Sequence, residues 1–192
     1  MVAPSVRARH MKLFVERVRD LDADRRDAVL ARIGPVDLDA IENASPLDWF
    51  PVEINVRATE AVWKALGPGA REGFFLRLGM EDFESPLLKG VVATALRLFG
   101  VEPGSLLKFA PRGWSQVFRD DATVTAASPG KGVATLTYAG LPAPLAESRI
   151  WIDSVAASMG AMFAVTKKRG TVTAEQIDVA SGSMTLVFRW ES

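Results

Sequence analysis

The sequence predicts an α+β fold, in which a helical N-terminal half precedes a ββαββ antiparallel sheet with one long helix packed on it. Three observations carry this prediction. Apolar residues recur every three or four positions up to about residue 119, which is typical of amphipathic helices. Near residue 120 the pattern changes to alternation, which is typical of half-buried strands. A long stripe of helical period then lies between two hairpins, so an antiparallel sheet covered on one face is the simplest packing.

Helix-stop signals divide the N-terminal half into separate helices. Gly34-Pro35 and Gly67-Pro68 each end one apolar stripe, and Pro111 is expected to kink or break the last helix. Gly73 and Gly79 weaken one segment, each costing about 1 kcal/mol relative to Ala. The expected helical segments cover residues 11–21, 22–33, 38–41, 52–66, 70–83, 86–99 and 103–119.

The C-terminal half contains two predicted hairpins on either side of one helix. Pro129–Gly132 and Ser181–Ser183 supply the turns. The helix between the hairpins is expected from about Pro144 to Arg169. The predicted strands cover residues 122–126, 134–138, 172–179 and 184–190.

The length of 192 residues suits one domain with an extension. We therefore expect a helical extension over residues 1–48 and an α+β domain over residues 49–192. The N-terminus has no continuous apolar run of the signal-peptide type. The longest mostly apolar run, Ser154–Thr166, is shorter than the roughly 20 residues that span a bilayer, so we expect no membrane span and a cytoplasmic location.

The composition excludes several kinds of site. The chain has no cysteine, which excludes disulfides and cysteine-type zinc sites, and it contains no phosphate-binding or dinucleotide-binding loop. Lys plus Arg and Asp plus Glu both number 23, so the basic excess typical of nucleic-acid binders is missing. We expect no metal, no cofactor and no nucleic-acid partner.

Two residues are candidates for chemistry. His10 is the only histidine and has two functional interpretations, a general base or an axial haem ligand. The alternative is an ordinary, partly exposed residue near a frayed terminus. Asp153 lies among apolar neighbours, four residues after Arg149, with which it is expected to form a weak ion pair. No catalytic motif accompanies either residue, so an enzyme is not expected.

Large aromatic residues of the C-terminal half indicate a ligand pocket between the long helix and the sheet. The pocket candidates are Trp114, Tyr138, Trp151, Phe163 and Trp190. A second stripe on the long helix consists of small residues, which allow another backbone to approach closely. These interface candidates are Ala157, Gly160, Ala161 and Ala164, and their neighbour is the sheet, another helix or a second subunit.

Several loose motifs from residue 49 onward resemble an uncharacterised protein family restricted to myxobacteria. They cover about 140 residues. They are Trp49-Phe50-Pro51, Leu66-Gly67, Leu106–Trp114 with Pro111, the helix that carries Gly160, Lys167–Gly170, and Phe188-Arg189-Trp190. That family is in turn similar to 4-vinyl-reductase-type domains, haem-nitric-oxide-binding domains and TRAPP-type trafficking subunits.

The resemblance implies a helical half followed by a ββαββ half, frequently dimeric, that binds small apolar molecules, haem or partner proteins. Many members are sensors or adaptors. The chain departs from them in its chemistry, because no histidine follows His10 to serve as the proximal haem ligand. The zinc and acyl-cysteine sites of the relatives require cysteines, which are missing here.

Three hypotheses follow. The first is a non-enzymatic small-molecule-binding or sensory module, forming a homodimer, with a 4-vinyl-reductase-like fold. The second is a protein-interaction or scaffold domain that acts through a dimer or partner interface. The third is an enzyme that uses carboxylates or backbone groups around Asp153, which would require this side chain to face a cleft.

Overall fold

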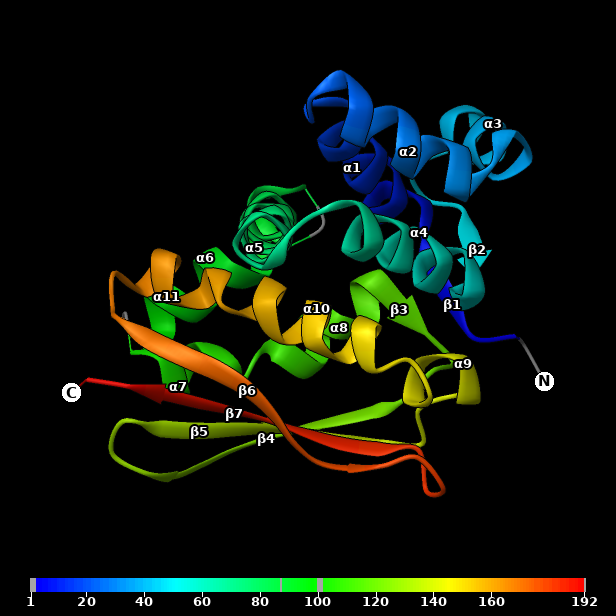
Figure 1. Cartoon of the computed structure of the whole chain (residues 1–192). Coiled ribbons are helices and arrows are strands. Elements are labelled where there is room, and N and C mark those ends of the chain that lie inside the picture. The colour runs from blue at the N-terminus through cyan, green and yellow to red at the C-terminus, as the bar shows by residue number, and fades with distance from the viewer. Residues whose placement is uncertain (1–2, 87, 100–101, 192) are drawn as a thin grey trace.

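The computed structural model describes residues 3–86, 88–99 and 102–191, and it contains helices and antiparallel strands, as an α+β fold requires (Figure 1). The strands are β1 (Ser5–Arg7), β2 (Trp49–Pro51), β3 (Phe118–Arg119), β4 (Thr123–Gly130), β5 (Val133–Ala139), β6 (Gly170–Asp178) and β7 (Ser183–Trp190). The helices of the first half are α1 (Ala8–Arg19), α2 (Ala23–Ile33), α3 (Pro35–Asn43), α4 (Val52–Ala65), α5 (Pro68–Glu84), α6 (Lys89–Phe99), α7 (Pro103–Leu107) and α8 (Ala110–Val117). The later helices are α9 (Ala143–Ala146), α10 (Arg149–Met159) and α11 (Ala161–Thr166).

A small sheet of order β2-β1-β3 joins parts of the helical half that lie far apart in the sequence. Val6 pairs with Phe50 on one side and with Phe118 on the other. The expectation that residues 118 and 119 continue a helix is wrong, because they form β3. These strands have only two or three residues each, so their alternation is too short to recognise in the sequence. The division between residues 1–48 and 49–192 cuts through this sheet.

The larger sheet has the order β4-β5-β7-β6, with all neighbours antiparallel. One face is apolar, with Leu136, Tyr138, Leu186 and Phe188 almost fully buried beneath the helices. Figure 1 shows α10 and α11 above this sheet, with α4 and α5 above them in turn. The sheet therefore forms the floor of the core.

The prediction of one continuous helix over residues 144–169 is wrong. Three helices, α9, α10 and α11, occupy this stretch. Ser148 caps α10 by accepting a hydrogen bond from the Trp151 backbone N–H, at 3.2 Å. The break between α10 and α11 falls at Gly160, which has a low helix propensity and lies against Leu76 of α5.

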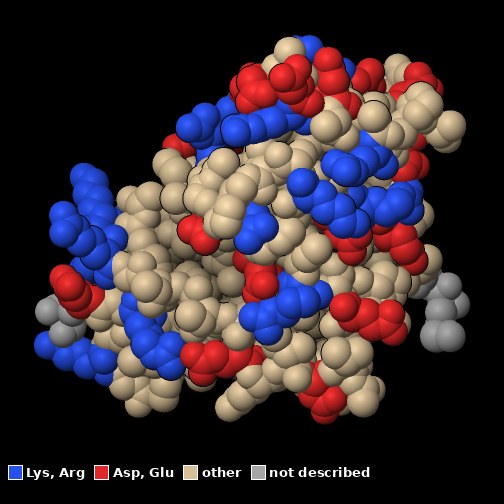
Figure 2. All heavy atoms as spheres, viewed as in Figure 1, with Lys and Arg blue, Asp and Glu red and all other residues tan. Residues whose placement is uncertain are grey.

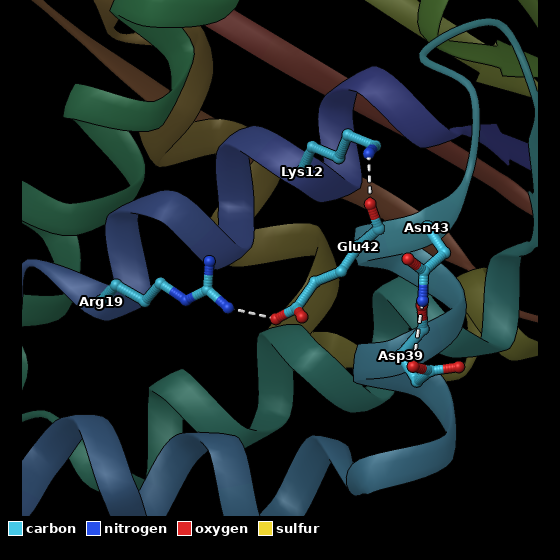
Figure 3. Close-up of polar contacts among 5 residues, drawn as sticks. All are labelled: Lys12, Arg19, Asp39, Glu42 and Asn43. Carbon is cyan, nitrogen blue, oxygen red and sulfur yellow. Dashed lines mark hydrogen bonds and ion pairs between the residues drawn. The ribbon is translucent and has the colours of Figure 1, made fainter.

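The α1 helix is fixed to the small sheet and to α3. The Ala8 N–H donates to the carbonyl of Asp48 at 2.8 Å. On the other side, Figure 3 shows Lys12 and Arg19 reaching Glu42 of α3, where Lys12 Nζ binds the backbone carbonyl at 2.7 Å and Arg19 binds the carboxylate. The first turn of α1 therefore has a fixed position over the core. Among the described residues, no helix is long and apolar enough to cross a membrane.

Candidate functional site

The core contains a cavity of about 130 Å³ between the helices and the larger sheet. Side chains from α1, α4, α5, α6, α7, α8, α10, α11 and β5 line it, together with Phe118 of β3. Most of these side chains are apolar. The apolar floor and the helical roof are brought together only by the long-range packing of the two halves of the chain.

Aromatic rings form one wall of the cavity. The indole of Trp114 stacks on Phe118, with ring centroids 4.3 Å apart and an angle of 18° between the planes. Tyr138 and Trp151 meet the same indole edge to face, at 4.8 and 6.2 Å. Three of the pocket candidates, Trp114, Tyr138 and Trp151, therefore lie together on the cavity.

The other two pocket candidates lie elsewhere. Phe163 is buried against the backbone of Gly170 at the start of β6. Trp190, at the end of β7, packs against Gly104 of α7. Neither residue is among those that line the cavity. The helical stripe predicted that Phe163 points inward, and strand alternation predicted the same for Trp190. Neither pattern reports how far a residue lies from this site, because periodicity does not identify the neighbour that a buried side chain meets.

Hydrogen bonds from their indole nitrogens hold the two cavity tryptophans. Trp151 Nε1 donates to Asn55 Oδ1 at 2.8 Å in the buried core, and Trp114 Nε1 donates to Asp121 Oδ2 at 2.8 Å. Burial raises the pKa of the Asp121 carboxyl, and the bond from Trp114 opposes that increase. Burial also raises the pKa of Tyr138, so its phenol is neutral at physiological pH. The hydrogen bonds to Asn55 and Asp121 thus hold the aromatic wall in position.

The polar end of the cavity consists of His10 and Asp82. His10, in the first turn of α1, contacts the Asp82 carboxylate of α5 through Nδ1 at 2.7 Å, and both residues line the cavity. The two side chains are only 13% and 15% exposed. The expectation of a frayed end at His10 is wrong, because β1 anchors the start of α1, whereas the side chain keeps a small partial exposure. No sequence signal links these two residues, which are 72 positions apart.

Asp153 does not face the cavity. Its carboxylate accepts from Arg149 Nε at 2.9 Å on a partly exposed face of α10. The weak ion pair that the four-residue spacing predicts is present. The motivation for an enzyme around Asp153 is therefore removed.

The small-residue stripe divides between the interior and the surface. Ala161 is fully buried and Ala164 is exposed, while Ala157 and Gly160 are half-buried. Gly160 lies beside Leu76 of α5. The closest helix approach nearby uses a different glycine, Gly79 of α5, where an added Cβ would lie 2.2 Å from the Ser158 carbonyl oxygen.

The charged surface is mixed in sign. Figure 2 shows Lys and Arg interspersed with Asp and Glu over the face in view, consistent with the balanced composition. The basic side chain of Lys168 pairs with Glu102 at 3.2 Å. Within the described part of the chain, no group of three or more His, Asp or Glu side chains is arranged to hold a metal ion.

No model of a known protein family matches this chain. No curated protein matches its sequence either.

Solved structures do match it, over nearly the whole chain. A Cs H-NOX variant with 4-cyano-L-phenylalanine at site 5 has a TM-score of 0.66 and 12% identity, covering 97% of both chains. The Fe(II) unliganded H-NOX protein from K. algicida has a TM-score of 0.64 and 10% identity, again covering 97% of both chains. An oxygen-binding H-NOX domain related to soluble guanylate cyclases has a TM-score of 0.60 and 12% identity, covering 95% of this chain and 93% of that one.

These matches support one of the three domain types named by the resemblance, the haem-nitric-oxide-binding type. The expectation of a 4-vinyl-reductase-like fold is corrected accordingly, since all of these similar structures are H-NOX proteins. At 10 to 12% identity the likeness concerns the fold and not the ligand. The chain has the fold of H-NOX domains.

Proposed function

We propose that this protein is a non-enzymatic small-molecule-binding or sensory module, and that the cavity on the Trp114 wall is its binding site. The observation that carries the proposal is an apolar cavity of about 130 Å³ that is lined mainly by residues of the hydrophobic core. Well-packed domains contain few voids larger than a water molecule. The hydrogen bonds behind Trp114 and Trp151 keep the aromatic wall in place, so the cavity is a built feature of the fold.

The residues present do not fit a haem group, although an H-NOX fold implies one. His10 with Asp82 on Nδ1 has the arrangement of many metal-ligating histidines. The space beside it is too small, because pockets for drug-sized ligands measure about 300–1,000 Å³ and a tetrapyrrole is at least that large a ligand. The rings of Trp114, Phe118 and Trp151 pack against one another along the wall of the cavity instead. The proposal therefore involves no iron.

The volume sets the size of the ligand. An apolar cavity of about 150 Å³ in another protein stays dry and binds benzene or xenon. A cavity of about 130 Å³ accepts a molecule of similar size. The proposed ligands are thus small apolar molecules that bind directly to the protein.

Two measurements test this function. Native mass spectrometry of the purified chain reports any co-purified small molecule together with the number of subunits. Toluene is then titrated while tryptophan fluorescence is recorded, because two of the five tryptophans, Trp114 and Trp151, lie on the cavity wall. Val155 lines the cavity, and Val155→Phe is expected to fill it and abolish binding. Val165 is also half-buried but lies off the cavity, so Val165→Phe is the matched control.

The proposal fails if toluene does not bind, or if both variants change its affinity equally. Added haemin is expected to give no Soret band of a ligated haem, and a stoichiometric band would contradict the haem-free site. The homodimer, the protein partner and the cytoplasmic location stay predictions. Light scattering of the same sample tests the homodimer.

A further inference from the structure

The cavity has one polar end, and this end restricts the chemistry of its ligand. Four uncharged polar residues, Asn55, Thr59, Ser154 and Ser158, also line the cavity. Asn55 and Ser154 already bond to Trp151, through its indole N–H and its carbonyl, and Thr59 and Ser158 each carry only a neutral hydroxyl. His10, Asp82 and Tyr138 are the ionisable groups among the described lining residues. The pair of His10 and Asp82 is therefore the strongest candidate for recognising a polar group of the ligand.

One nitrogen of His10 is open to the cavity. Nδ1 is engaged by Asp82, while Nε2 has no hydrogen-bond partner among the described residues. Among the described residues, the side-chain nitrogens that are fully buried without a hydrogen-bond partner are those of Arg9, Arg17 and Trp190, and His10 Nε2 is not among them. Nε2 therefore borders open space, and the space that His10 lines is the cavity.

Asp82 fixes the tautomer of the imidazole. Since a carboxylate only accepts, the proton of a neutral His10 lies on Nδ1 and Nε2 is an acceptor. In the protonated form both nitrogens donate. A hydroxyl group suits both forms, because it can donate to Nε2 or accept from it.

Other ligand chemistries fit this end less well. A hydrocarbon would shut water out and leave Nε2 without a partner, which is costly for a buried polar group. A carboxylate would place a second negative charge beside Asp82. An ammonium group would have to lose its water in a cavity that is lined mainly by apolar side chains, which is costly for a charged group.

We propose that His10 and Asp82 form the specificity-determining end of the cavity, and that the ligand is a neutral apolar molecule of benzene size with one hydroxyl group, such as a phenol. This inference rests on the proposed function of the cavity. His10 contacts the hydroxyl, and Asp82 is a positioning residue that holds the imidazole. The aromatic wall of Trp114 and Trp151 contacts the apolar part of the ligand.

The test compares phenol with toluene, which differ by a hydroxyl in place of a methyl group. Both are titrated by calorimetry into the full chain, the His10→Asn variant and the Asp153→Asn variant. Asn places its amide near the position of Nδ1, so His10→Asn can keep a bond to Asp82 while it removes Nε2. Asp153 lies off the cavity and gives the matched control.

We expect the unaltered chain to bind phenol at least about tenfold more tightly than toluene, because only phenol satisfies Nε2. Asp153→Asn should retain this ratio, and His10→Asn should reduce it to near one. If His10→Asn does not fold, the double variant His10→Phe, Asp82→Leu replaces both partners with apolar groups. It should bind toluene more tightly than phenol, because the buried hydroxyl would then have no hydrogen-bond partner.

The remaining outcomes overturn the inference. Equal affinities in the unaltered chain would mean that the polar end does not select ligands, while the proposed binding function would stand. A preference for phenol that persists without the imidazole would assign recognition to another group. Failure of both molecules to bind would remove the proposed function as well as this inference.

Discussion

The contact between α5 and α10 gives a quantitative prediction about two glycines of one helix. Gly73 and Gly79 both lie inside α5, so each Gly→Ala change gains about 1 kcal/mol of helix propensity. An added Cβ at Gly73 meets nothing within 4 Å. At Gly79 it would lie 2.2 Å from the carbonyl oxygen of Ser158 and 2.8 Å from its carbonyl carbon. Backbone atoms would have to move there.

Gly73→Ala is therefore expected to raise the free energy of unfolding by about 1 kcal/mol. At Gly79, overpacking costs about 3 kcal/mol at the upper end of its usual range, which leaves a net loss of about 2 kcal/mol. The two variants should thus differ by about 3 kcal/mol with opposite signs. Urea unfolding followed by tryptophan fluorescence measures both values. If Gly79→Ala were as stabilising as Gly73→Ala, the close approach of α5 and α10 would be refuted.

Three further predictions concern the site and its surroundings. Burial lowers the pKa of His10, but the charge and hydrogen bond of Asp82 raise it to a net value above the ordinary 6.5. The stability from this pair is therefore complete below pH 6.5 and lost as pH rises through the folded pKa. In Asp82→Asn only burial remains, so NMR titration of the single imidazole should give a pKa below 6.5; an unchanged pKa would contradict the pairing. Trp114→Phe removes the hydrogen bond to Asp121, should raise the pKa of that carboxyl further, and should cost about 1–3 kcal/mol at pH 7. The destabilisation from a raised acid pKa grows as pH rises from the unfolded to the folded pKa, so the cost should shrink at pH 4, and a pH-independent cost in urea unfolding would refute the bond's electrostatic part. Asp153→Asn removes an exposed ion pair and should change stability by less than about 1 kcal/mol without altering toluene affinity, as calorimetry can check.

The presence of an aromatic pocket could be predicted from the sequence, but the residues that meet in it could be predicted only in part. The pattern of large aromatics in the C-terminal half indicated a pocket, and Trp114, Tyr138 and Trp151 do meet on one wall. Phe163 and Trp190 have the same pattern and lie elsewhere, because periodicity reports that a side chain is buried and not which neighbour it meets. Only the packing of α8 and α10 over β5 distinguishes the residues that line the pocket from Phe163 and Trp190, which do not.

The polar end of the cavity could not be predicted at all. His10 and Asp82 lie in different helices, and each has an ordinary local explanation in the sequence. Their meeting depends on β1, which pairs with β2 and β3 and fixes the first turn of α1 over α5. Strands of two or three residues are too short to show a detectable alternation. The small sheet that positions His10 therefore has no sequence signature.

The sequence by itself determined the class of the fold and the chemistry that is missing from it. The helical period before residue 120 and the alternation after it follow from the repeat of the helix and strand backbones, so they indicate the class of the fold. A chain without cysteine has no thiol, whatever its fold. Tertiary structure decided the rest. The cavity and its pair of His10 and Asp82 both depend on long-range packing. Such contacts join residues whose local sequences carry no information about each other.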